Sequence, residues 1–196
     1  MNYLGHAYLS FGDPDLLAGN MIGDHVKGRK ALESFPGKIR QGIERHRAID
    51  QYTDTHPAML QAKVLFRPAY GLYAGAITDT LTDYFLANDP ALFANEAALR
   101  QFAQQVYVQL DSRRAFLPVA FLPYLDSMKL HDWLGNYRSY EGIRRSLQGL
   151  HRRAVHMPDP AVAYDLFRAE EHTLRTYYES FIGDVISFVK IGPPGG

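Results

Sequence analysis

Proline and glycine divide this chain into segments of helical length, and the spacing of these helix-breaking residues constrains its fold more than any other feature. Asp13-Pro14 and Asp159-Pro160 each place a capping residue directly before a proline, which is typical of a helix start. Across residues 15 to about 27, apolar side chains recur at the spacing of one helical face. Neither a sustained apolar/polar alternation nor an Asn-Gly hairpin indicates a strand. The sequence therefore predicts an all-α fold.

The same signals predict where the helices begin and end. We expect about seven to nine helices in a compact bundle, forming a single domain over residues 1–196. The proline- and glycine-rich residues 190–196 are expected to form a disordered tail. The expected helices cover residues 15–27, 36–55, 57–68, 70–87 and 90–110, two lie between 124 and 153, and the last runs from 160 to about 189.

Composition excludes several classes of function. The 21 acidic residues balance 21 basic ones, whereas nucleic-acid binding as a main function usually needs a basic excess. The chain has no cysteine, which excludes a disulfide framework, a thiolate zinc site and a cysteine nucleophile. No signal-peptide pattern is present, and no segment approaches the roughly 18 apolar residues that span a bilayer. We expect a cytoplasmic protein whose partners are neither nucleic acid nor membrane.

Two acidic clusters suggest a metal site. His46, Asp50 and Asp54 are spaced four residues apart, so they share one face of the helix expected over 36–55. Asp79 and Asp83 repeat this spacing in an otherwise apolar segment, where a buried carboxylate costs several kcal/mol unless it is paired or bound to metal. Oxygen ligands with one or two imidazoles favour Mn²⁺, Mg²⁺ or Fe²⁺. Such a site can orient a phosphodiester and activate water.

Further polar residues lie near these clusters, and simpler explanations stay open. His6 follows the start of the chain in an apolar context, and Asp24 follows Asn20 by four residues. The first cluster could equally be a solvated, salt-bridged helix face. Asp79 could pair with an arginine such as Arg67, and a lone buried histidine is usually a hydrogen-bonded core residue. Spacing alone does not decide between these interpretations.

Taken together, these segments resemble the acyl carrier protein phosphodiesterase family, an HD-domain-like group of metal-dependent hydrolases. The resemblance implies an HD-like helical bundle that hydrolyses the phosphodiester joining the 4′-phosphopantetheine arm to a serine of holo-acyl carrier protein. It also implies a manganese-dependent enzyme, with Mg²⁺ or Fe²⁺ as alternatives. The matching stretches are MNYLGHAYLSF at 1–11, LLAGNMIGDHVKG at 16–28, GIERHRAIDQYTD at 42–54 and ITDTLTDYFLA at 77–87, with weaker similarity in WLGNYRSYEGI at 133–143.

Residue by residue, the resemblance implies the members of the site. Lys27 and Arg47 occupy basic positions of the same motifs and are candidates for holding the phosphate. His6 or a water at the metal would protonate the leaving serine oxygen. His6 and Asn20 would support the metal or add ligands to it. The implied metal ligands are Asp24, His46, Asp50, Asp79 and Asp83, of which Asp50 is also a candidate catalytic residue.

One departure from the family pattern concerns Tyr84, because the family typically has histidine after the aspartate at position 83. If that histidine is a ligand or proton donor, this chain would be slow, altered in metal preference or inactive. If it only supports the ligands, a tyrosine could replace it by hydrogen bonding. Two alternative functions stay open. One is an HD-type hydrolase of a nucleotide or other small phosphodiester, and the other is a degenerate member that binds a carrier protein without cleaving it.

A carrier protein that is small and strongly acidic would need a local basic surface on this neutral chain. Three pairs of neighbouring arginines are candidates for that docking surface. The alternative is that each pair lies on an ordinary solvated helix face. The pairs are Arg113 with Arg114, Arg144 with Arg145, and Arg152 with Arg153.

Overall fold

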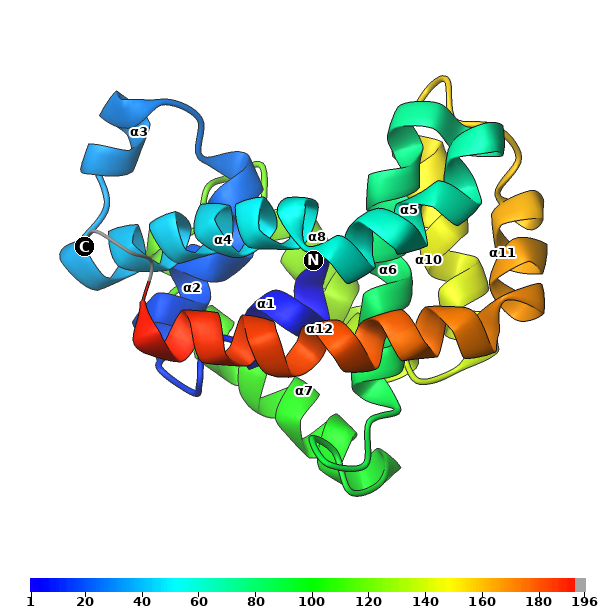
Figure 1. Cartoon of the computed structure of the whole chain (residues 1–196). Coiled ribbons are helices and arrows are strands. Elements are labelled where there is room, and N and C mark those ends of the chain that lie inside the picture. The colour runs from blue at the N-terminus through cyan, green and yellow to red at the C-terminus, as the bar shows by residue number, and fades with distance from the viewer. Residues whose placement is uncertain (193–196) are drawn as a thin grey trace.

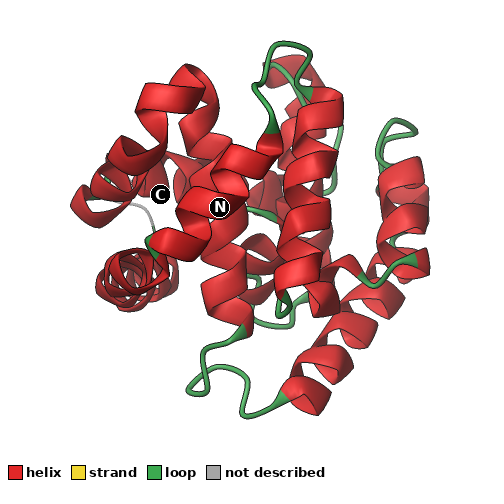
Figure 2. Ribbon diagram, turned by 90° about the vertical axis from the view of Figure 1, so that its right-hand side faces the viewer, coloured by secondary structure: helices red, strands yellow, loops and turns green. Residues whose placement is uncertain are grey.

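The computed structural model describes residues 1–192, and all regular structure in that range is helical (Figures 1 and 2), which confirms the all-α prediction. Three short 3₁₀ turns, η1 (Gly23–His25), η2 (Gly71–Tyr73) and η3 (Arg114–Phe116), connect longer elements. The α-helices are α1 (Tyr3–Tyr8), α2 (Pro14–Ile22), α3 (Arg29–Glu33), α4 (Gly37–Thr55), α5 (Pro57–Tyr70), α6 (Ala74–Ala87), α7 (Glu96–Ser112), α8 (Leu122–Leu130), α9 (Trp133–Asn136), α10 (Tyr140–Arg153), α11 (Pro160–Ala169) and α12 (Glu171–Ile191).

The described chain contains more helices than the expected range, because the last predicted helix is divided and the short helices α1, α3 and α9 were not predicted. The last predicted helix breaks at Glu170 into α11 and α12. A short extra helix, α9, follows Asp132, whose left-handed backbone turns the chain and whose side chain accepts from the Gly135 amide. The disordered tail was expected from residue 190, but α12 continues to Ile191. The rest of the expected tail, from residue 193 onward, lies outside the described residues. The single domain over 1–196 stays a prediction.

Helices α2 and α4 pack closely against each other at two facing glycines. A methyl group on Gly19 would lie 2.0 Å from the Ile39 carbonyl oxygen, and one on Gly42 would lie 2.4 Å from the Leu16 carbonyl oxygen. Only glycine permits so close an approach of two helix backbones. This crossing brings the end of α2, which carries Asn20, against the middle of α4.

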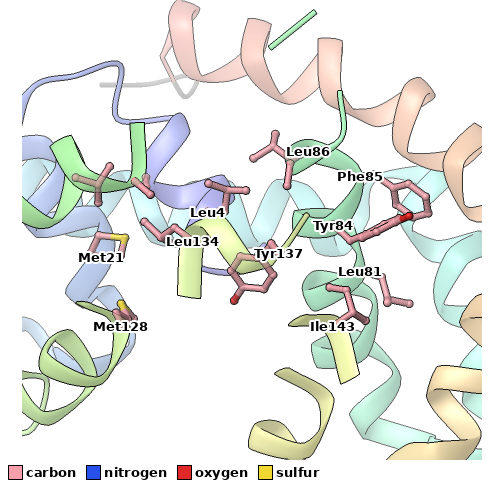
Figure 3. Packing of buried hydrophobic residues seen from close by; sticks show 14 of the residues in the cluster. Leu4, Met21, Leu81, Tyr84, Phe85, Leu86, Met128, Leu134, Tyr137 and Ile143 are labelled. Atoms are coloured by element: carbon pink, nitrogen blue, oxygen red, sulfur yellow. The ribbon is translucent and has the colours of Figure 1, made fainter. Parts of the chain in front are cut away.

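The main core surrounds α1 and α6 and is built from all parts of the chain. Eleven of the 14 residues of α6 are buried, so this helix runs through the interior. The long helix α12 crosses one side of the molecule and packs on α4, α5 and α6 (Figure 1). No described helix is long and apolar enough to cross a membrane. Figure 3 shows core residues contributed by six helices: Leu4, Met21, Leu81, Met128, Leu134 and Ile143.

Candidate metal centre

Two histidines from distant parts of the chain stack on each other at the centre of the site. The rings of His6 on α1 and His46 on α4 have centroids 4.0 Å apart and planes inclined by 18°. His6 Nδ1 lies 2.8 Å from Asn20 Oδ1, and His46 Nδ1 lies 2.7 Å from the Asn20 carbonyl oxygen. The Asn20 amide nitrogen donates to the His6 carbonyl oxygen, so its Oδ1 is an acceptor. Both neutral rings therefore carry the proton on Nδ1 and the lone pair on Nε2.

Both Nε2 atoms face carboxylate oxygens. His6 Nε2 lies 3.1 Å from Asp50 Oδ1, and His46 Nε2 lies 3.0 Å from Asp50 Oδ2 and 3.4 Å from Asp24 Oδ1. A lone pair that faces an anionic oxygen is repelled unless a proton or a cation lies between them. His46 Nε2 is also buried and has no hydrogen-bond partner within residues 1–192. These donors fit a divalent cation, because each Nε2 is oriented by a hydrogen bond at the opposite ring nitrogen.

Asp79 adds a third carboxylate from α6. Its Oδ1 is the other buried side-chain atom without a hydrogen-bond partner in the described range. The Met1 amino nitrogen lies 3.3 Å from this oxygen and 3.2 Å from Asp50 Oδ1, so the two carboxylates converge on one point. Asp24, His46 and Asp79 also line one cavity of about 250 Å³. Among the described residues, His6, His46 and Asp50 offer ligand atoms that all lie within 4.8 Å of one another, and Asp24 and Asp79 lie at the edge of this group.

The carboxylates make this site attractive to positive charge. Burial opposes the charged form of His46, but Asp24 and Asp50 outweigh burial and raise its pKa to about 9. Burial and the neighbouring His46 lower the pKa of His6 to about 4, so its ring is neutral near pH 7. Although partial burial opposes the charged form of the half-buried Asp50, the two imidazoles hold its pKa well below the usual range. The same negative field would hold a cation in place of the proton on His46.

Asp83, the fifth predicted ligand, is engaged elsewhere. Its side chain is fully buried, and its two oxygens accept from the backbone amides of Leu4 (2.7 Å) and Gly5 (3.1 Å). These amides belong to the first turn of α1, where a helix has unpaired donors. Burial raises the pKa of Asp83 to about 7 against the effect of these donors. The carboxylate therefore fixes α1, which carries His6, and does not point to the other four residues.

The two predicted phosphate-binding residues lie outside the cavity. Lys27 is exposed, and Arg47 Nη2 donates to the Val26 carbonyl oxygen at 2.8 Å. The cationic side chain that lines the cavity is Arg153, at the end of α10. In the sequence, Arg153 was noted only as one of a pair of neighbouring arginines. Its place beside the histidines could not be predicted, because more than a hundred residues separate it from them. Asp54, the third member of the first cluster, pairs with Lys63 instead at 2.6 Å.

Tyr84 faces away from the metal cavity. Its hydroxyl donates to Glu171 Oε1 at 2.9 Å, and its ring contacts Phe85, Tyr140 and Phe167. Figure 3 shows the Tyr84 hydroxyl pointing away from Leu4 of α1. The residue that departs from the family pattern therefore belongs to an aromatic cluster between α6, α10 and α11, and this removes its link to the candidate ligands.

Replacing Tyr84 by histidine is expected to leave the rate of phosphodiester cleavage within about threefold of that of the unchanged protein, because the side chain at position 84 does not contact the candidate metal ligands. The variant should lose about 1–3 kcal/mol of stability, since the buried ring packing and the bond to Glu171 are disturbed. Thermal unfolding and initial rates measure the two effects. A gain in turnover of about tenfold or more would contradict this placement of the side chain.

Comparisons with known proteins show the family of this chain. Residues 1–185 match the family model described as acyl carrier protein phosphodiesterase. A protein named acyl carrier protein phosphodiesterase from Enterobacter sp. (strain 638) is 29% identical over 180 residues, covering 92% of this chain and 89% of the relative. One of the same name from Salmonella agona (strain SL483) is 27% identical with the same coverage. No solved structure matches. The chain belongs to the acyl carrier protein phosphodiesterase family.

Proposed function

We propose that this chain is a metal-dependent phosphodiesterase that removes the 4′-phosphopantetheine arm from holo-acyl carrier protein. The observation that carries the metal dependence is the pair of buried imidazoles whose Nε2 lone pairs are both directed at the half-buried Asp50 carboxylate. The substrate comes from the names of the relatives. The oxygen-rich donor set with imidazoles suits Mn²⁺, Mg²⁺ or Fe²⁺, and the family resemblance favours Mn²⁺ among them.

Different residues of the chain have different roles in the proposed reaction. His46, Asp24, Asp50 and Asp79 would hold the metal, with His6 as a further ligand. Because the neutral His6 ring carries its proton on Nδ1, a water at the metal would protonate the leaving serine oxygen. When bound, the metal would neutralise the phosphate charge and lower the pKa of an attacking water. Asn20 holds both imidazoles in the tautomer that exposes Nε2. Asp83 keeps α1 in place through the Leu4 and Gly5 amides.

Arg153 is the residue that we assign to the phosphate. It lines the cavity with the candidate ligands, and it forms no ion pair with a carboxylate of the described chain. A guanidinium can donate two parallel hydrogen bonds to phosphate oxygens. Replacing Arg153 by alanine is expected to lower kcat/KM by about a hundredfold, whereas Lys27→Ala should change it by less than about threefold. Steady-state kinetics with holo-carrier protein would compare them, and equal losses would contradict the assignment.

The direct test is the intact mass of holo-acyl carrier protein after incubation with this protein and Mn²⁺. We expect water to be added across the phosphodiester, so that the carrier loses the mass of phosphopantetheine less one water, and we expect a chelator to prevent this loss. Adding Mn²⁺ back after the chelator should restore it. An unchanged carrier, together with cleavage of bis(4-nitrophenyl) phosphate, would instead assign the site to another small phosphodiester. An unchanged carrier that remains bound would identify a non-catalytic binding protein.

A further inference from the structure

A second, larger cavity adjoins the metal cavity. Its volume is about 600 Å³, and its walls come from the start of the chain and from α8, α9 and α10. Asn2, Tyr3, Tyr124 and Arg153 line both cavities, so the two meet at these four side chains. Small-molecule pockets have volumes of roughly 300–1,000 Å³. The larger cavity therefore has room for an organic group attached to a phosphate at the metal.

Apart from its three arginines, the walls of this cavity offer aromatic and uncharged polar side chains that suit a chain with amide groups. The ring centroids of Tyr3 and Trp133 lie 6.2 Å apart, and these rings supply flat apolar surface for methylene and methyl groups. Asn136, Ser146 and Gln148 supply hydrogen-bond donors and acceptors. No aspartate or glutamate of the described chain lines the cavity. An uncharged ligand with several amides would find partners for both its polar and its apolar parts.

Three arginines line the larger cavity, namely Arg145, Arg152 and Arg153, and of these Arg153 alone also lines the metal cavity. Arg145 pairs with Glu141 at 3.0 Å, whereas Arg152 and Arg153 pair with no carboxylate within residues 1–192. Another of the arginine pairs is neutralised, because Arg113 contacts Asp15 and Arg114 contacts Asp126. A ligand with a phosphate at one end would thus place that end at Arg153 and its neutral end in the larger cavity.

We propose that the larger cavity, which we name the arm groove, binds the pantetheine part of the phosphopantetheine arm during cleavage. The inference rests on the proposed function and adds the residues that select for the arm. Phosphopantetheine carries two amides, a hydroxyl and a gem-dimethyl group beyond its phosphate, which match the polar and aromatic walls described above. The arm groove would therefore favour phosphodiesters with this arm over phosphodiesters without it.

Gly149 on α10 offers a way to fill the arm groove without disturbing the fold. It lines the groove, and a methyl group there would meet only the mobile end of Arg152, at 3.6 Å. Leucine is a better helix former than glycine by about 1 kcal/mol, so Gly149→Leu should fold normally. The matched control is Gly183→Leu on α12, an exposed helical glycine with nothing within 4 Å of the added carbon.

Rates on two substrates distinguish an effect on the arm groove from an effect on the candidate metal site. We expect Gly149→Leu to lower kcat/KM on holo-carrier protein by at least about tenfold and to leave cleavage of bis(4-nitrophenyl) phosphate within about twofold. Gly183→Leu should match the unchanged protein on both substrates. Equal rates of Gly149→Leu and the unchanged protein on holo-carrier would overturn the inference. An equal loss on both substrates would also overturn it.

A binding measurement tests the groove without turnover. Trp133 is the single tryptophan of the chain and lines the groove, so its fluorescence reports a ligand there. Titration with 4′-phosphopantetheine should give a saturable change in the unchanged protein and in Gly183→Leu, and none in Gly149→Leu. Inorganic phosphate should give a smaller change. No response to 4′-phosphopantetheine, or a tighter response to a nucleoside monophosphate, would overturn the inference. If holo-carrier stays intact in the mass measurement but 4′-phosphopantetheine still gives a saturable fluorescence change, the proposed function is rejected and the binding role of the arm groove is retained.

Discussion

Replacing His46 by alanine is expected to reduce release of the phosphopantetheine arm by at least about a thousandfold, the largest effect on activity that we predict. The side chain supplies the buried Nε2 that has no hydrogen-bond partner in residues 1–192, and it lies 3.0 Å from Asp50 Oδ2. Without it the carboxylates lose the imidazole that completes the donor set. The matched control is His172→Ala, an exposed histidine on α12 that should retain full activity.

Metal binding provides a second measurement for the same variant. In the unchanged protein, Mn²⁺ at a hundred times its dissociation constant should stabilise the fold by about 2.7 kcal/mol. His46→Ala should lose most of this stabilisation, and His172→Ala should keep it. Thermal unfolding with and without Mn²⁺ measures the difference. Equal stabilisation of both variants by Mn²⁺ would show that the cation binds elsewhere and would remove the basis of the proposed site.

Replacing Gly42 by alanine is expected to give the largest loss of stability, about 3 kcal/mol or more in the free energy of unfolding. The added methyl group would lie 2.4 Å from the Leu16 carbonyl oxygen and 2.8 Å from Gly19 Cα. Both contacts are with backbone, so α2 and α4 must move apart. Since these helices carry Asn20 and His46, we also expect metal binding to weaken. Chemical denaturation and Mn²⁺ titration would measure the two effects.

Gly37→Ala is the control in the same helix. Gly37 begins α4, and nothing lies within 4 Å of the carbon that the substitution adds. Alanine there should leave stability unchanged or raise it by up to about 1 kcal/mol. A Gly42→Ala variant as stable as Gly37→Ala would mean that the two helices are not held at this distance in solution.

Local signals in the sequence determined the fold class and much of the candidate ligand set. The spacing of His46 and Asp50 on one helix follows from helical geometry alone, and the structure places both at the centre of the site. The caps at Asp13 and Asp159 likewise start helices where predicted, because a cap needs only the next three residues. The HD-like relationship and the identity of the metal stay predictions.

Only the tertiary structure decided which polar side chains face one another. Asp79 and Asp83 have the same spacing as His46 and Asp50, yet Asp79 points to the site while Asp83 binds the amides of α1. The helix alone cannot distinguish them, because the difference depends on which neighbour packs against each position.

The position of Arg153 and the direction of Tyr84 also depend on packing between distant segments. Arg153 reaches the metal cavity because α10 packs on α6, and Tyr84 meets Glu171 because the start of α12 also packs on α6. The sequence by itself determined the helices and the residue types available for metal chemistry. The packing of helices far apart in the chain decided which of those residues meet, because side-chain contacts over such separations have no local signal.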